Sequence, residues 1–145
     1  MKYIRDGRAP IPKSEVTSKI MSKIRGKHTQ PELALRRSLR ELGLVGYRLH
    51  WNKAPGRPDI AYPQRKVAIF VNGCFWHQCP YCRPPMPKSH VSFWKKKFQR
   101  NRERDVAKVR ALKANGWKVL TCWECQIKKD SRSCVRKVKS LLSQK

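Results

Sequence analysis

One fifteen-residue segment constrains this chain more than any other, because it joins an apolar strand to a group of metal-binding side chains. Residues 68–82 read AIFVNGCFWHQCPYC, an apolar run and a glycine followed by three cysteines, a histidine and two adjacent large aromatics. A continuous apolar run is typical of a strand covered on both faces. An ordinary core would not place three thiols and an imidazole at the end of such a strand. The segment therefore predicts a metal site at the edge of a sheet.

The charge of the chain indicates a polyanionic partner. Among 145 residues there are 35 Lys and Arg but 9 Asp and Glu, which gives a formal net charge of +26. Neutralising phosphates releases counterions, so nucleic acid is the expected partner. No long apolar run or separate cationic amphipathic helix favours a membrane. A ribosomal-type basic protein without catalytic chemistry is the alternative that charge alone leaves open.

The length of the chain is that of one domain, large enough to bury a core without disulfides. Residues 1–13 are expected to form a flexible basic arm, because a glycine and two prolines oppose regular structure there, and residues 14–145 to form the domain. The N-terminal segment lacks the apolar core of a signal peptide, which predicts a cytosolic, reducing location. Clustered cysteines in that compartment are more often zinc ligands than disulfides.

Hydrophobic periodicity and capping residues predict an α/β domain. The expected helices cover about 14–24, 29–43, 90–114 and 131–143, and the expected strands cover about 46–51, 58–62, 66–71 and 117–123. Thr29 and Glu32 have the spacing of a capping box at the start of the second helix. This order of elements predicts a mixed sheet flanked by helices.

The cysteine spacing predicts a structural zinc site. Cys74, Cys79 and Cys82 supply three thiolates, and either Cys122 or Cys125 could supply the fourth. Alternation along a continuing strand would point these last two to opposite faces, so only one is expected to reach the metal. Buried or reactive free thiols are the alternative. The separate Cys134 is expected to be a small buried residue on the last helix.

Acidic residues are scarce, so those beside apolar segments are candidates for catalysis. Asp59 follows Pro58 at the start of an expected strand, where a carboxylate can bind a catalytic Mg²⁺; a simple turn or strand cap is the alternative. Glu32 is equally suited to the capping box. His77 is a candidate zinc ligand, core histidine or general base, and the cysteines free it from the first role.

Several motifs connect these residues and are shared with one known family. They are Thr29-x-Pro31-Glu32, Pro55-Gly56-Arg57-Pro58-Asp59, Ile69-Phe70-x-x-Gly73-Cys74-Phe75-Trp76-His77, Phe93-Trp94, Asn101-x-x-Arg104-Asp105 and Gly116-Trp117-x-Val119-Leu120-x-x-Trp123-Glu124-Cys125. Over about residues 14–126 the chain closely resembles the very short patch repair (Vsr) endonucleases. The resemblance implies a restriction-endonuclease-like fold. It also implies nicking of duplex DNA on the 5′ side of the thymine in a T·G mismatch, the lesion left by deamination of 5-methylcytosine.

The resemblance also implies roles for particular residues. Asp59 would bind Mg²⁺ together with the backbone carbonyl of Val71, and Glu32 would lie near the metal through water. His77 would be the general base, oriented by Asp105.

Further residues would support the metal or contact DNA. Asn101 would support the metal's water shell, and Phe75, Trp76 and Trp94 match aromatics that wedge into the duplex beside the mismatch. For Trp94 a place in the core is the alternative, since it lies on the apolar stripe of its helix. Residues 1–20 would cross the minor groove. Unstacking a mismatched pair costs less than unstacking a paired one, so wedging can contribute selectivity.

The chain departs from the family pattern at a few positions. Asn72 replaces a usual histidine beside the phosphate, and asparagine can donate a hydrogen bond there but cannot transfer a proton. Val71 replaces a usual threonine. Cys79 replaces a common histidine and Cys82 comes one residue late, so the expected zinc ligands are all thiolates, with Cys125 as the fourth.

The resulting expectation is a zinc-stabilised, Mg²⁺-dependent endonuclease that nicks double-stranded DNA near a T·G mismatch. We expect a monomer in the bacterial cytoplasm, associated with the nucleoid and functionally linked to a cytosine-5 DNA methyltransferase. Two alternatives remain. One is a related restriction-type endonuclease or nickase acting on intact duplex sites, and the other is a catalytically silent, zinc-containing DNA-binding protein.

Overall fold

The structure is a computed structural model that describes residues 29–144. The expected arm over 1–13 and the expected helix over 14–24 lie outside these residues. The described elements, in chain order, are α2 (Gln30–Glu41), β1 (Arg48–Leu49), β2 (Ile60–Tyr62), β3 (Val67–Asn72), α3 (Cys74–His77), α4 (Val91–Ala114), β4 (Lys118–Trp123) and α5 (Glu124–Ser143).

The strands form one mixed sheet in the order β1-β2-β3-β4. β2 pairs antiparallel with β1 and with β3, whereas β3 and β4 are parallel and are joined by the crossover helix α4. In the β3–β4 register Asn72 lies opposite Trp123, so both strands end at the same edge of the sheet. The predicted mixed sheet flanked by helices is therefore confirmed, with β1 shorter than expected.

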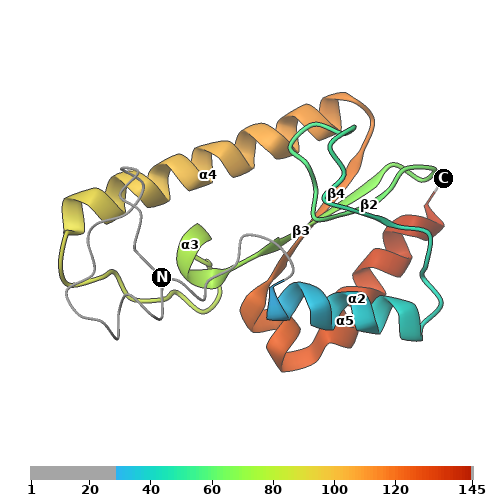
Figure 1. Cartoon of the computed structure of the whole chain (residues 1–145), viewed down its shortest axis with the longest axis horizontal. Helices are drawn as coiled ribbons and strands as arrows, with labels where there is room; N and C mark the ends of the chain where they lie inside the picture. Colours follow the sequence, from blue (N-terminus) through green and yellow to red (C-terminus); the bar gives the residue numbers. More distant parts are fainter. Residues whose placement is uncertain (1–28, 145) are drawn as a thin grey trace, which may run out of the picture.

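Helices cover both faces of the sheet, and side-chain alternation along β3 supplies a core to each face. Val67 and Ile69 pack with α2 and α5, while Ala68 and Phe70 pack with Leu112 of α4. In Figure 1, α4 runs along one side of the sheet while α2 and α5 lie together on the other. The continuous apolar run of the sequence is thus explained by burial on both faces.

The long helix α4 has two different environments. Near its C-terminus Leu112 is buried against the sheet, whereas near its N-terminus Trp94 and Phe98 are buried among other aromatic rings. Val106, expected on the same apolar stripe, is 56% exposed. The middle of α4 therefore crosses the sheet without being packed tightly against it.

Two helical segments differ from the predictions. α5 begins at Glu124, directly after β4, and the expected helix over 131–143 is only its second part, beyond the non-helical Asp130 (φ −161°, ψ 92°). The side chain of Gln126 accepts a hydrogen bond from the Trp123 backbone N–H at 3.3 Å, which caps the early start. α3 is a single turn that ends at Gln78 (φ 50°), too short for periodicity to predict.

Among residues 29–144, no helix is long and apolar enough to cross a membrane.

Candidate functional site

Four cysteines meet beside the ends of β3 and β4. Cys74 begins α3, Cys79 and Cys82 lie in the loop after it, and Cys125 lies in the first turn of α5. Their Sγ atoms all lie within 4.8 Å of one another. The Cys125 backbone N–H donates to Cys74 Sγ at 3.3 Å, and the Tyr81 N–H donates to Cys79 Sγ at 3.4 Å. Four converging thiols of this kind can hold a tetrahedral metal ion.

The structure also distinguishes the two candidates for the fourth thiol. Cys122 is buried in the core under α2 and α5, whereas Cys125 joins the cluster. Only one of them reaches the site, as alternation predicted, although the reason is that the chain turns into a helix after Trp123. Cys134 is 2% exposed, which confirms its expected burial.

A second cluster consists of Glu32, His50 and Asp59, whose ligand atoms also lie within 4.8 Å of one another. Asp59 directly precedes β2, and its Oδ2 accepts a hydrogen bond from the Val71 N–H of β3 at 2.8 Å. Burial raises the pKa of Asp59 to about 6, and the charge of Glu32 adds to this effect, while the Val71 hydrogen bond opposes it. A cation placed here would favour the ionised carboxylates.

The loop before Asp59 is held against α4. Gly56 has a φ of +76°, and a Cβ at this position would lie 2.8 Å from the Cβ and Cγ of Lys108. Only glycine fits this close approach without movement of the neighbouring helix. The contact places Asp59 at the start of β2 and brings Lys108 near enough for its charge to lower the pKa of that carboxyl.

Glu32 is only 2% exposed and uses its carboxylate for contacts within the cluster. Its backbone N–H donates to Thr29 Oγ1 at 3.4 Å, which is one half of the expected capping box. Its carboxylate accepts from Arg36, one turn along α2, and lies 2.9 Å from His50 Nε2. The carboxylate thus lies near that of Asp59, and a catalytic role for Glu32 stays a prediction.

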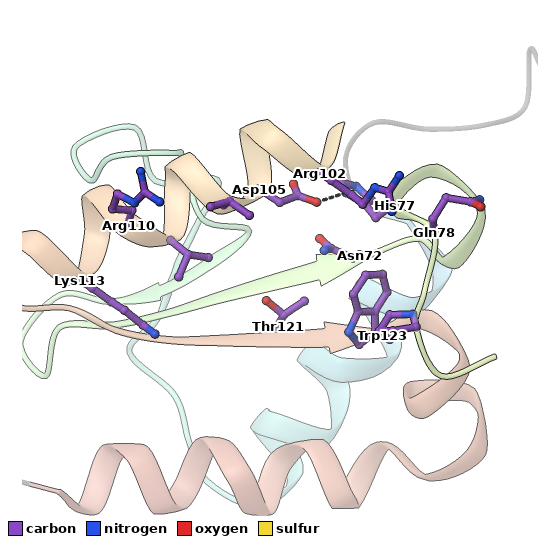
Figure 2. Close-up of a pocket in the computed structure, with 12 residues that line it drawn as sticks. Asn72, His77, Gln78, Arg102, Asp105, Arg110, Lys113, Thr121 and Trp123 are labelled. Carbon is purple, nitrogen blue, oxygen red and sulfur yellow. Dashed lines mark hydrogen bonds and ion pairs between the residues drawn. The ribbon is translucent and has the colours of Figure 1, made fainter. Parts of the chain in front are cut away.

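His77 is the last residue of α3, the turn that follows the end of β3. Its Nδ1 is 2.6 Å from Asp105 Oδ2, which joins α3 to α4 (Figure 2). The Asn101 side-chain amide donates to the Trp76 carbonyl at 2.8 Å and fastens the same two helices. Asn72 is 8% exposed and extends from the end of β3 toward His77 and Asp105.

An open pocket of about 780 Å³ lies between α4 and the end of the β3–β4 pair. His77, Asp105 and Asn72 form one end of it, and β4 contributes Thr121 and Trp123 (Figure 2). The cations along its α4 side are Arg102, Arg110 and Lys113. A hollow with an imidazole at one end and cations along one wall suits a phosphate backbone.

The aromatic residues expected to enter DNA are packed against one another. Phe75 makes edge-to-face contacts with Trp76 and Trp94, at centroid distances of 5.1 and 5.3 Å. Trp94 is 7% exposed and stacks on Phe98 at 5.6 Å. The structure therefore brings these residues together, and their role on DNA stays a prediction.

Sequence reasoning missed two groups near Asp59. His50 follows a two-residue strand in which nothing in the local pattern marks a functional side chain. Lys108 is one of many cations on α4, and the overall charge could not single it out. Its Nζ lies 5.9 Å from the Phe70 ring centroid, on the Asp59 side of the sheet.

Comparison with known proteins identifies related chains. Residues 11–83 match the family described as DNA mismatch endonuclease Vsr. A type II nicking enzyme, V.XorIIP of Xanthomonas oryzae, is 42% identical over 74% of this chain and 79% of its own length. The nicking enzyme V.NaeI of Lentzea aerocolonigenes is 37% identical over 89% and 80% of the two chains. The DNA mismatch endonuclease Vsr of Escherichia coli is 35% identical over 77% and 70%.

Proposed function

The chain belongs to the DNA mismatch endonuclease Vsr family and is an endonuclease that acts on DNA. We propose that it nicks one strand 5′ to the thymine of a T·G mismatch. Residues 14–145 would form the endonuclease domain, with a restriction-endonuclease-like fold. Its substrate would be the lesion left by deamination of 5-methylcytosine, which links it to a cytosine-5 DNA methyltransferase. We expect a monomer to be sufficient.

The observation that supports this proposal most strongly is that two pairs of candidate catalytic residues lie near the end of β3. Asp59 is held by the Val71 N–H at 2.8 Å, and His77 is held by Asp105 at 2.6 Å. The charge of His77 acts on the pKa of Asp59, which places the two groups within electrostatic reach of each other. Metal-assisted hydrolysis of a phosphodiester uses a metal-binding carboxylate and a base for the attacking water, and Asp59 and His77 are the candidates for these two roles.

The carboxylate cluster fits the Mg²⁺ expected for such an enzyme. Its oxygen donors are of the kind that Mg²⁺ prefers. Burial is the main cause of the raised pKa of Asp59, the charge of Glu32 adds to it, and a bound cation would offset both. Asp59 and the Val71 carbonyl would hold the ion, with Glu32 nearby through water. When bound, the ion supplies positive charge to the scissile phosphate.

His77 would remove the proton from the attacking water. Because Asp105 accepts from Nδ1, the Nε2 lone pair is the one available to the water. Asp105 also stabilises the imidazolium that forms after proton transfer. Asn72 lies beside this pair and can donate a hydrogen bond to a phosphate oxygen but cannot share the proton transfer. The reaction would thus depend on one imidazole at the phosphate.

We further propose that the four cysteines hold one structural Zn²⁺, which a closed tetrahedral set of thiolates suits. Cys74 lies in the same helical turn as His77 and the adjacent Phe75 and Trp76. The metal would therefore fix the turn that carries both the base and the rings expected to enter DNA. Its role would be to position these groups rather than to react.

Entry of the aromatic residues beside the mismatch would require the packed rings to separate from one another. Phe75 and Trp76 are partly exposed in the present arrangement, whereas Trp94 is buried. We therefore propose that Phe75 and Trp76 make the first contact with the base pairs and that Trp94 supports them. A T·G pair is easier to unstack than a matched pair, which would contribute to selectivity.

A second candidate function is nicking of intact duplex sites, since several relatives are named as type II nicking enzymes. Purified protein is incubated with T·G and T·A duplexes of otherwise identical sequence, with and without Mg²⁺. We expect a single nick 5′ to the thymine of the T·G duplex, only with Mg²⁺, and none with the Asp59→Ala variant. Equal nicking of both duplexes would favour the intact-site enzyme, and DNA binding without nicking would favour the silent binding protein.

A further inference from the structure

His50 is a mostly buried imidazole that the mechanism above does not use. Its side chain is 12% exposed and lies between the carboxylates of Glu32 and Asp59. The backbone is in the left-handed region, with a φ of 46°, and the His50 N–H donates to the Asp59 carbonyl at 3.0 Å. A left-handed conformation is unfavourable for a residue with a Cβ. Here it directs the ring into the carboxylate cluster, and such conformations concentrate at functional sites.

The two ring nitrogens have different relations to the carboxylates. Nε2 lies 2.9 Å from Glu32 Oε1, which is a close ion-pair distance that lacks the alignment of a hydrogen bond. Nδ1 lies 3.7 Å from Asp59 Oδ1, which is too long for one. The ligand atoms of Glu32, His50 and Asp59 thus converge within 4.8 Å of one another, an arrangement that a shared cation would suit.

The space between these two atoms suits a divalent cation. Transition-metal ions lie about 2.0–2.2 Å from imidazole nitrogen and carboxylate oxygen, so two ligand atoms 3.7 Å apart can share one ion. The second oxygen of Asp59 is held by the Val71 N–H, which leaves Oδ1 on the side of His50. Metal-binding histidines commonly have a carboxylate beside their other ring nitrogen, as His50 has Glu32 beside Nε2.

We propose that His50 is a metal ligand through Nδ1, with Glu32 orienting the ring through Nε2. This rests on the proposed metal-dependent nuclease site and adds a nitrogen donor to its oxygen ligands. Mg²⁺ prefers oxygen ligands, whereas imidazole favours transition-metal ions. The site should therefore bind Mn²⁺ more tightly than Mg²⁺, and His50 should be the reason.

The test is a titration of the full-length, zinc-loaded protein with Mn²⁺ in the absence of DNA, followed by the EPR signal of free Mn²⁺. His50→Gln is expected to weaken Mn²⁺ binding about tenfold or more, and to bring the Mn²⁺ and Mg²⁺ affinities closer together in competition. His90→Gln is the matched control, because His90 is also left-handed (φ 56°) but exposed and outside the cluster. It should bind Mn²⁺ as the unmodified protein does.

A second measurement does not depend on the folding of a variant. In the unmodified protein, pulsed EPR of bound Mn²⁺ should show hyperfine coupling to an imidazole ¹⁴N, which carboxylate and water ligands alone do not give. Unchanged Mn²⁺ affinity in folded His50→Gln, or bound Mn²⁺ without nitrogen coupling, would overturn the assignment and indicate an imidazolium that only bridges two carboxylates. The nicking assay tests the proposed function separately. If the unmodified protein nicks the mismatch but His50→Gln binds Mn²⁺ unaltered, only this inference is refuted. If Mn²⁺ binds through His50 but the protein does not nick, only the proposed function is refuted.

Discussion

Replacing Asp59 with asparagine is expected to stabilise the fold in the absence of divalent cations while abolishing nicking. The cause is the burial of an ionised carboxylate beside Glu32, which raises the pKa of Asp59 from 3.8 to about 6. At about 1.36 kcal/mol per pKa unit, the ionised form is about 3 kcal/mol less favourable in the folded protein than in the unfolded chain. An amide carries no charge and avoids this cost.

The net gain should be smaller than the electrostatic term. The pKa of about 6 already includes the hydrogen bond from the Val71 N–H at 2.8 Å, so that bond is not counted again. The amide, however, has an NH₂ group in place of one carboxylate oxygen, and imperfect pairing of this group offsets about 1 kcal/mol or more of the gain. We therefore expect Asp59→Asn to raise the free energy of unfolding by about 1–2 kcal/mol at neutral to alkaline pH.

The pH dependence follows from the direction of the pKa shift. Because the folded pKa of Asp59 is raised, the folded protein binds the proton more readily than the unfolded chain between pH 3.8 and about 6. The cost of ionisation is fully present above the folded pKa and is lost as the pH falls toward the unfolded one. The advantage of the asparagine variant should therefore be largest near pH 8 and shrink as the pH falls through about 6.

Urea unfolding of zinc-loaded protein without Mg²⁺, at several values between about pH 5.5 and 8, measures this difference. Adding Mg²⁺ should stabilise the unmodified protein and leave Asp59→Asn unchanged, because binding to the folded state alone shifts the equilibrium. Asp130→Asn, at an exposed acid of α5, is the matched control and should show no such gain. Greater stability of the unmodified protein near pH 8 without divalent cations would refute the reasoning.

Further predictions concern the thiol cluster, the base and the DNA surface. Cys125→Ser should lose the bound zinc and Cys122→Ser should retain about one zinc per chain, as metal analysis would show; the reverse result would exchange their roles. Asp105→Asn should slow single-turnover nicking about 10- to 100-fold with little effect on DNA binding, because the charge-assisted hydrogen bond to His77 is lost. Glu103→Gln, at an exposed residue of the same helix, is the control and should leave the nicking rate nearly unchanged. DNA affinity should fall with salt by a log–log slope of about −0.9 per phosphate contacted, and an unchanged slope in Arg110→Ala would remove that residue from the phosphate surface.

The layered fold could be predicted because local patterns and tertiary burial agree in most segments. The apolar run ending at Val71 is β3, and the run before Trp123 is β4. The start of α5 could not be predicted, since Glu124 and Cys125 continue the strand pattern and only the turn after Trp123 ends it. The single turn α3 was missed because four residues are too few to show helical periodicity.

The thiol cluster could be predicted because its ligands are close in the sequence and chemically distinctive. The carboxylate cluster was predictable only in part, because Glu32 and Asp59 were noted through their scarcity and shared motifs, and His50 had neither feature. The place of His50 in the cluster becomes visible only when β1 pairs with β2 and carries the residue after Leu49 toward Asp59. Antiparallel pairing, which no local pattern specifies, assembles this part of the site.

The parallel register of β3 and β4 has a consequence for the order of assembly. Cys74 and Cys125 are separated by most of the second half of the sequence, yet each follows its strand end by two residues, and those ends, Asn72 and Trp123, lie opposite each other. Pairing of the two strands therefore closes the long loop by itself, and a metal ion would have only a short gap left to bridge. Removal of the metal ion by a chelator should therefore release residues 74–82 and abolish activity while the sheet stays folded. Metal supply could then control activity without unfolding the protein.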